Sequence, residues 1–154
     1  MANFRASFLN KIDQKGRVSV PASFRAILGE ENKTIFCMAS IPFEAIDVYT
    51  QERLDALNER FERENDPFSA DYGRHHMIMD GDVWPVTIDA DGRMIIPDAL
   101  RDHAGITEHA TFVGAGAHFQ IWDPATHQKE RAKARKAMRA RMGIVEEPEG
   151  PGFK

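Results

Sequence analysis

Short stretches in which hydrophobic and polar residues alternate occur throughout the chain, and glycine or proline bounds most of them. Phe4, Ala6 and Phe8 alternate with other residues up to Ile12, and residues 83–88 form a similar run later in the sequence. This period of two is typical of β-strands with one buried face. Further short apolar runs predict strands as well, at residues 34–38, 45–49, 110–113 and 118–122.

Three longer segments carry helical signals instead. Apolar residues recur at i, i+3 and i+7 from Leu54 to Phe61, which predicts an amphipathic helix. Asp66-Pro67 and Asp123-Pro124 each combine a capping residue with a proline suited to the first helical turn. We therefore expect one helix from Asp66 to Met79 and another from Asp123 onward. Strands and helices together predict an α+β fold.

The sequence repeats itself at an offset of 76 residues. Ile12–Arg25 lies over Ile88–Arg101, and Ile, Asp, Gly, Arg, Pro and the final Arg coincide. The same offset pairs Phe36 with Phe112, and after a three-residue adjustment 46–49 falls on 119–122. A half of about 75 residues is expected to bury too little apolar surface to be stable alone. The two halves should therefore pack as a pseudo-two-fold dimer, with their hairpin tips on the same side.

Each half contains the same tight turn, at Asp13-Gln14-Lys15-Gly16 and at Asp89-Ala90-Asp91-Gly92. Aspartate at the first position and glycine at the fourth are typical of a type I turn closing a hairpin with a left-handed glycine. The returning strands stop at Pro21 and Pro97, which suit the first turn of a short helix because proline has no amide hydrogen to lose there.

The overall composition excludes several classes of protein. With 154 residues, 42% of them hydrophobic and 29% charged, the chain is expected to be globular with a buried core. Its apolar runs fall far short of the roughly 20 residues of a membrane span, and the N-terminus lacks a signal-peptide pattern. We therefore expect a cytoplasmic protein without a membrane partner. Cys37 lies in an apolar run and is expected to be a buried hydrophobe.

A net charge of −4 argues against a nucleic-acid binder when it is averaged over the chain. The charge is unevenly distributed, however. Residues 44–82 hold eleven acidic and four basic side chains, whereas residues 1–35 hold six basic and three acidic ones. Residues 129–141 carry seven Lys or Arg and one Glu, a net charge of +6. We expect an exposed helix there, whose cations are solvated, bind DNA phosphates, or contact the acidic middle of a neighbouring subunit.

The two hairpins carry the strongest candidate chemistry. Their Asp-x-x-x-Arg motif has a structural interpretation, in which Asp13 or Asp89 caps the turn and the arginine pairs with it. Its recurrence in the same context suggests a shared geometric task. Arg17 and Arg93, with Lys15 beside the first, offer donors suited to phosphate oxygens or a guanine edge. The expected DNA-binding residues are thus Lys15, Arg17 and Arg93, and the expected turn-forming residues are Asp13, Gly16, Asp89 and Gly92.

The order of strand, Asp-x-x-Gly-Arg turn, Val-Ser-Val-Pro and short helix ending in arginine, given twice around a helical segment, resembles the MraZ family of bacterial transcriptional regulators. Members of this family are tandem relatives of the SpoVT/AbrB swapped-hairpin domains. The resemblance covers about residues 3–130 and is most specific at Asp13–Pro21, Asp89–Pro97 and Val113–Asp123.

The resemblance implies AbrB-like swapped-hairpin halves, a β-barrel core with flanking helices, and a ring-shaped homo-oligomer. It also implies binding to short G-rich direct repeats in the promoter of the division and cell wall gene cluster, and we expect a nucleoid-associated repressor. By position, Asp13 and Arg17 match the first DNA-binding motif of the family, and Asp89 and Arg93 match the second. Asp91 stands where the first copy has Lys15, so the resemblance does not imply equal contributions from the two halves.

The repeat divides the chain into four segments. These are a first half at 3–66, a helical linker at 67–82, a second half at 83–128, and a basic helix followed by a tail, expected to be disordered, at 129–154. The six histidines lack the spacing of metal-ligand pairs, and no nucleophile motif is present. We expect no enzymatic activity, cofactor, metal or small-molecule substrate.

The sequence is also compatible with two other function classes. One is an antitoxin-like AbrB relative that acts mainly through a protein partner, with the acidic middle of the chain as its docking surface. The other is an enzyme whose site is assembled between subunits, for which the sequence offers no candidate residues.

Overall fold

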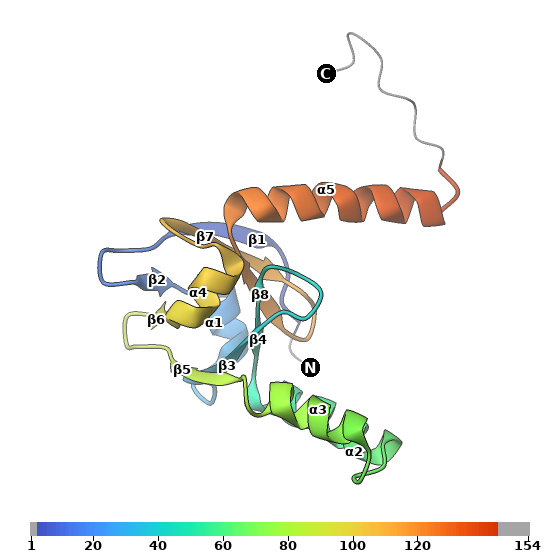
Figure 1. Cartoon of the computed structure of the whole chain (residues 1–154). Helices are drawn as coiled ribbons and strands as arrows, with labels where there is room; N and C mark the ends of the chain where they lie inside the picture. Colours follow the sequence, from blue (N-terminus) through green and yellow to red (C-terminus); the bar gives the residue numbers. More distant parts are fainter. Residues whose placement is uncertain (1–2, 145–154) are drawn as a thin grey trace. The chain divides into compact units, whose positions relative to one another are not determined.

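The computed structural model describes residues 3–144, which contain eight strands and five helices (Figure 1). The strands are β1 (Ser7–Lys11), β2 (Arg17–Ser19), β3 (Thr34–Ala39), β4 (Ile46–Tyr49), β5 (Trp84–Thr87), β6 (Arg93–Ile95), β7 (His109–Gly114) and β8 (Phe119–Trp122). The helices are α1 (Ala22–Leu28), α2 (Gln51–Glu64), α3 (Ala70–Met79), α4 (Asp98–Ala104) and α5 (Pro124–Arg141). The predicted α+β class is confirmed.

Six strands form one antiparallel sheet in the order β1-β7-β8-β4-β3-β5, and β2 and β6 pair with each other in a separate two-stranded ribbon. Within the described residues the sheet is open, with β1 and β5 at its edges, and not the closed barrel that the resemblance implies. The reason is that β2 and β6, which follow the two edge strands along the chain, pair together and do not join those edges.

The strand order is symmetric between the two halves. The equivalent strands of the two halves are β1 and β5, β3 and β7, and β4 and β8. When each strand is exchanged for its equivalent, the sheet has the same order read from its opposite edge. The first strand of each half also leaves its own half, since β1 pairs with β7 and β5 pairs with β3. Each half therefore contributes an edge strand to the other, and neither sheet half is complete alone.

The equivalence between the halves shifts by one residue at β3 and β7. The amides of Ile12 and Ile88 donate to the carbonyl oxygens of Glu108 and Lys33, each at 2.8 Å. Ile12 and Ile88 are 76 residues apart, but Lys33 and Glu108 are 75 apart. The segment after α4 is one residue shorter than the segment after α1, so Phe112 lies in the place of Cys37 and not of Phe36.

The first strand begins later than its alternating pattern predicts. Ala6 has a φ of 72°, which interrupts the strand, and Phe4 pairs separately with Gly116. Gly114 lies under this bend, where a Cβ atom would come within 2.5 Å of the Arg5 backbone. Only glycine fits at position 114 without moving the N-terminal segment. The Gly114-Ala115-Gly116 sequence lies at the β7–β8 turn. The Ala115 amide closes this turn by donating a hydrogen bond of 3.0 Å to the His118 carbonyl oxygen.

The short helices α1 and α4 pack into the core between the two halves. Pro21 and Pro97 stand at the N-cap of these helices, one position before the first turn where we expected them. Phe24 of α1 is fully buried, with ring centroids 5.4 Å from Phe4 and 5.0 Å from Phe119. The core therefore depends on residues from both halves.

The predicted burial of Cys37 is confirmed. Its side chain is 0% exposed within the main hydrophobic cluster, and burial raises the pKa of its thiol to about 12. A thiol with so high a pKa is almost entirely protonated near neutral pH, and only the thiolate is nucleophilic. Cys37 therefore acts as a core residue.

Helices α2 and α3 pack against each other and cover a second apolar cluster. Met38, Tyr49, Leu54 and Met79 are its buried members. The helix predicted to begin at Asp66 begins instead at Ala70, after Ser69, whose side chain accepts a hydrogen bond from the Tyr72 amide. Asp66 accepts a hydrogen bond from the Phe68 amide within a turn, and Phe68 is 95% exposed.

Among the described residues, 3–124 form one compact unit, and 125–144, which include most of α5, form a second. The tail that we expected to be disordered, Glu146–Lys154, lies outside the described residues. No helix within residues 3–144 is long and apolar enough to cross a membrane.

Candidate nucleic-acid interface

The two hairpin turns have the same backbone geometry. In the first, the Asp13 amide donates to the Arg17 carbonyl at 2.9 Å and the Gly16 amide donates to Asp13 at 3.0 Å. The corresponding distances at Asp89 in the second turn are 2.8 Å and 3.0 Å. The φ angles of Gly16 and Gly92 are +81° and +78°, in the left-handed region that favours glycine.

The first aspartate of each turn also binds the turn through its side chain. Asp13 Oδ1 accepts hydrogen bonds of 2.9 Å from the amides of Lys15 and Arg17. Asp89 Oδ1 accepts from the amides of Asp91 at 2.9 Å and Arg93 at 3.0 Å. The bond from the Arg17 or Arg93 amide is the main reason why the pKa of each carboxyl is lowered. The charged carboxylates thus stiffen both turns.

The two arginines differ in their side-chain partners. Arg17 Nε lies 2.8 Å from Asp13 Oδ2, so this pair closes across the hairpin. In the second hairpin, Arg93 Nε lies 4.0 Å from Asp89 Oδ2, while Nη2 donates to Asp91 Oδ2 at 3.1 Å. Arg93 Nε is buried and has no hydrogen-bond partner within the described residues. Asp91 at the tip therefore draws the Arg93 guanidinium away from the arrangement seen at Arg17.

The β2–β6 ribbon brings both arginines onto one face. Val18 pairs with Met94, and both side chains point into the core. Because side chains alternate along a strand, their neighbours lie on the opposite, outward face. Arg17 is opposite Ile95 and Arg93 is opposite Ser19 in this register, which makes the two arginines diagonal neighbours, about 7–8 Å apart in such ladders.

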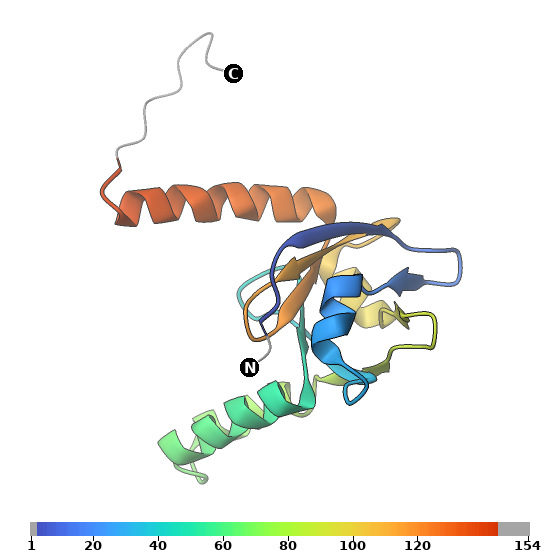
Figure 2. The ribbon, with the colours of Figure 1, turned by 180° about the vertical axis from the view of Figure 1, so that it is seen from behind.

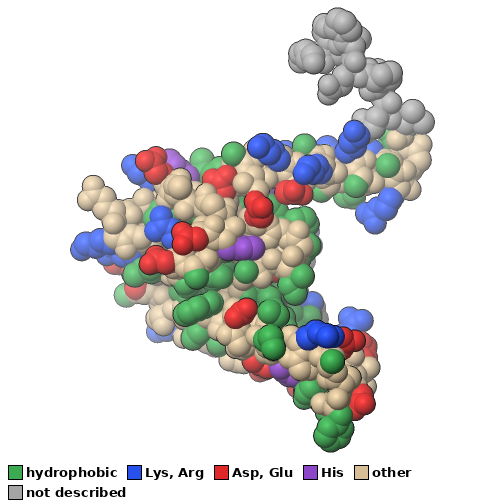
Figure 3. Space-filling view, in the orientation of Figure 1, with side chains coloured by type: hydrophobic (Ala, Val, Ile, Leu, Met, Phe, Trp, Pro, Cys, Tyr) green, Lys and Arg blue, Asp and Glu red, His purple; other side chains and the backbone are tan. Residues whose placement is uncertain are grey.

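Both hairpins project from the same side of the unit that contains them (Figures 1 and 2). Lys15 is exposed at the tip of the first hairpin. A shallow depression beside the ribbon is lined by Arg17, Arg93 and Asp89, and Arg17 also contributes to the lowered pKa of Asp89. Basic and acidic side chains lie together on this side of the surface (Figure 3). The structure thus places Arg17 and Arg93 near one another, with Lys15 at the tip of the hairpin that carries Arg17.

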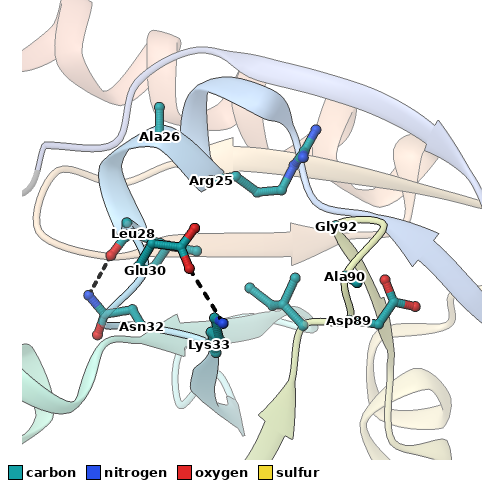
Figure 4. A pocket seen from close by; sticks show the side chains of 11 residues that line it. Arg25, Ala26, Leu28, Glu30, Asn32, Lys33, Asp89, Ala90 and Gly92 are labelled. Atoms are coloured by element: carbon teal, nitrogen blue, oxygen red, sulfur yellow. Dashed lines mark hydrogen bonds and ion pairs between the residues drawn. The ribbon is translucent and has the colours of Figure 1, made fainter.

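Two further arginines lie beside the hairpins and were not singled out from the sequence. A Cβ atom on Gly92 would lie 2.7 Å from Arg25 Nη1, because Arg25 extends from α1 toward the second hairpin (Figure 4). Arg101 of α4 takes the equivalent place at the first hairpin, 3.6 Å from a Cβ on Gly16. Each hairpin is therefore flanked by an arginine from the other half of the repeat.

Hydrogen bonds to main-chain oxygens position these two side chains. Arg25 Nε donates to the Val20 carbonyl at 3.0 Å, and Arg101 Nη2 donates to the Thr107 carbonyl at 3.0 Å. The signal for both was present in the sequence, since Arg25 and Arg101 are the final matching residues of the repeat. Their proximity to the opposite hairpin depends on how the halves pack, which the repeat alone does not reveal.

The assembled surface has the features of a nucleic-acid contact. It combines five cations, Lys15, Arg17, Arg25, Arg93 and Arg101, with three aspartates that lie in the turns. A two-stranded ribbon fits the major groove of B-form DNA, where arginine can bond to guanine and to flanking phosphates. Within residues 3–144, no group of three or more His, Cys, Asp or Glu side chains is arranged to hold a metal ion.

Comparison with known proteins places the chain among regulators. Residues 4–74 and 84–142 match the family described as "MraZ protein, putative antitoxin-like". A protein of Rhizobium rhizogenes named "Transcriptional regulator MraZ" is 42% identical, over 88% of this chain and 92% of its own length. Proteins of the same name from Rhizobium meliloti and Rickettsia akari are 39% and 36% identical, over 92% and 86% of this chain and 97% and 89% of their own lengths.

Proposed function

We propose a function from one premise: this chain belongs to the MraZ family, and its relatives are named transcriptional regulators. The chain is a transcriptional regulator. Our proposal is that it represses the division and cell wall gene cluster by binding short direct repeats in its own promoter. It acts in the cytoplasm, associated with the nucleoid, without an enzymatic activity, a cofactor or a small-molecule substrate.

The observation that carries this proposal is the outward face of the β2–β6 ribbon. Arg17 and Arg93 lie there as diagonal neighbours. In both hairpins the turn is held by a hydrogen bond from the arginine amide to the aspartate side chain. We propose that Arg17 and Arg93 contact base edges or phosphates, that Lys15 adds a phosphate contact, and that Asp13 and Asp89 orient the arginines. Arg25 and Arg101 extend the same surface on either side of the ribbon.

The exchange of edge strands between the halves supports the swapped-hairpin interpretation of the fold. In that interpretation each hairpin, β1–β2 or β5–β6, crosses to the other half, and the four segments predicted from the sequence are one fused pair of domains, a linker and a basic extension. The β1 and β5 edges then belong to a single DNA-binding unit with two related tips.

Repeated sites would compensate for the acidity of the chain. The surface of one subunit carries few cations beyond those offset by Asp13, Asp89 and Asp91, so a single copy should bind DNA weakly. We propose a ring of subunits in which several such surfaces engage consecutive repeats. Binding of one surface raises the effective concentration of the next, which can increase the overall affinity by about 100-fold or more.

The test uses the full chain and the DNA upstream of its own gene. Arg17→Ala should lose about 1–3 kcal/mol of binding free energy per site in a gel-shift titration, while the mass from light scattering stays unchanged. Arg74→Ala, which removes an exposed arginine paired with Asp71 on α3, is the matched control and should bind normally. Equal affinity of the Arg17→Ala variant and the unaltered chain would refute the assignment.

The description "antitoxin-like" in the matched family favours one other candidate. In that case the chain would act mainly through a protein partner that contacts the acidic α2–α3 pair. Co-purification of a stoichiometric basic partner, together with no binding to the upstream DNA, would support it over the proposed function.

A further inference from the structure

A second cationic surface lies on α5, outside the hairpins. Residues 129–141 carry a net charge of +6, and every side chain from Arg131 to Arg141 is exposed. Lys and Arg side chains follow one another along this helix in Figure 3. Lys133 pairs with Glu130 at 3.4 Å, but Arg131, Arg135 and Lys136 have no hydrogen-bond or ion-pair partner within residues 3–144. The proposed function does not account for this concentration of charge.

The cations are unevenly arranged around the helix axis. At 100° per residue, six of the seven lie within an arc of about 200°, in the order Arg131, Arg135, Arg139, Lys136, Lys129 and Lys133. The remaining arc holds Glu130, Ala134, Ala137 and Met138 together with Arg141. One broad side of α5 is therefore basic along the length of this segment.

This composition does not suit an apolar partner. The core of a protein interface is formed by large apolar or aromatic side chains, and the only apolar residues in 129–141 are alanines and Met138. A helix lying in a membrane surface needs Leu, Phe or Trp on its apolar face, which this segment also lacks. A partner that is recognised by charge alone fits α5 better.

The acidic helices of a second copy are a weaker match than a polyanion. Several of their carboxylates already have partners within the α2–α3 pair, since Glu64 pairs with Arg60 at 3.3 Å and Asp71 with Arg74 at 3.0 Å. Glu62 accepts a hydrogen bond of 2.6 Å from Tyr72. The phosphates of DNA, by contrast, present a continuous row of charge that accepts lysine and arginine alike.

We infer that α5 binds the phosphate backbone of DNA without sequence preference, as a contact additional to that of the hairpins. This inference rests on the proposed function only for the choice of DNA as the polyanion. Because α5 follows β8 directly along the chain, a hairpin bound to its site keeps α5 at high local concentration near the flanking phosphates. The hairpins then supply specificity and α5 supplies affinity that depends on salt.

The test measures the salt dependence of binding with the full chain. Arg131→Gln, Arg135→Gln and Lys136→Gln are combined in one variant, since glutamine preserves helix propensity while removing the charge. The matched control combines Arg60→Gln, Arg63→Gln and Arg74→Gln, which removes the same charge from α2 and α3. Affinity is measured for the upstream DNA and for a scrambled duplex of equal length, over a range of salt concentrations.

The α5 variant should lower the slope of log K against log salt by about 2–3 on both duplexes, since each phosphate contact contributes about 0.9. The control should keep the slope of the unaltered chain, and circular dichroism should show unchanged helix content in both. An unchanged slope for the α5 variant, or an equal change in the control, would overturn the inference. A change in the oligomeric mass of the α5 variant would also overturn it, because α5 would then contact another subunit.

The two proposals fail in different ways. If the unaltered chain prefers the upstream DNA but its slope does not depend on α5, the inference fails and the proposed function stands. If the chain binds both duplexes equally and the slope depends on α5, the inference stands and sequence-specific regulation fails.

Discussion

Asp47 and Gln120 occupy equivalent positions in the two halves, and Gln120 Nε2 donates a hydrogen bond of 2.8 Å to Asp47 Oδ1. The same two residues are directly opposed in the β4–β8 register. Val18 and Met94, another equivalent pair, oppose each other in the β2–β6 ribbon. The pseudo-two-fold axis therefore passes through both pairs, one in the sheet and one behind the candidate DNA-binding face.

Asp47 should contribute measurably to the junction between the halves. It is 8% exposed, and Tyr49 and His118 also lie within 3.5 Å of its carboxylate oxygens. Asp47→Ala leaves the buried Tyr49 hydroxyl and the half-buried Gln120 amide without this acceptor, and should lower the free energy of unfolding by about 1–3 kcal/mol in urea denaturation. Asp47→Asn keeps an oxygen that can accept from Gln120 and should lose less. Equal losses for the two variants would contradict the importance of that bond.

Asp91 should weaken the contribution of the second hairpin to DNA binding. Its carboxylate holds Arg93 Nη2 at 3.1 Å and places negative charge at the tip. Asp91→Lys should release Arg93, raise the affinity for the upstream DNA, and steepen the salt slope by about 0.9 for each added phosphate contact. Asp55→Lys, an equal change of charge on the exposed face of α2, should leave the slope unchanged. A similar gain from both variants would indicate an effect of net charge alone.

Gly92 should tolerate substitution less well than Gly16. Both have φ near +80°, so alanine costs each hairpin about 1 kcal/mol from the backbone alone. At Gly92 the added Cβ would also meet Arg25 atoms at 2.7–2.8 Å, whereas the nearest atom at Gly16 is 3.6 Å away. Denaturant unfolding should therefore show a larger loss for Gly92→Ala.

A second variant isolates the contact with Arg25. In an Arg25→Ala background, the difference between Gly92→Ala and Gly16→Ala should disappear. If the difference persists there, the asymmetry between the hairpins has a cause other than the Arg25 side chain.

The histidine cluster between α2 and α3 should make stability depend on pH. His76 Nδ1 contacts Asp80, and Nε2 lies 3.0 Å from Glu62 Oε1. The Asp80 carboxylate, followed by that of Glu62, raises the pKa of His76 above its ordinary 6.5. A raised pKa in the folded state gives stability that is present below about pH 6.5 and is lost as the pH rises through the folded pKa.

Substitution of His76 separates this effect from other titrations. The melting temperature of the unaltered chain should exceed that of His76→Gln at about pH 6, and the difference should shrink by about pH 8. The pKa of His75 is lowered mainly by burial, which opposes the trend, but His75 is present in both proteins. His109→Gln removes an exposed histidine outside the cluster and is the control. A difference that grows with pH would refute the assignment.

Much of the local structure followed from local rules in the sequence. Asp at the first position and Gly at the fourth of each turn predicted both hairpins, because these preferences depend on backbone angles within four residues. The predicted strands at 34–38, 45–49, 83–88, 110–113 and 118–122 appear within one residue of their bounds. The predicted start of α3 at Asp66 was wrong. The Asp66 side chain accepts a hydrogen bond within a turn, and Ser69 caps the helix instead.

The amino-acid sequence by itself determined the turns, the strands and the arginines that each half carries, because these depend on residues close together in the chain. Comparison of the sequence with itself also revealed the repeat. Only the tertiary structure decided that β1 pairs with β7, that Arg25 lies against Gly92, and that Arg93 is held by Asp91. Alternation shows which face of a strand is buried but not which strand lies beside it. That choice is made when two halves, each too small to bury its own core, complete one core together.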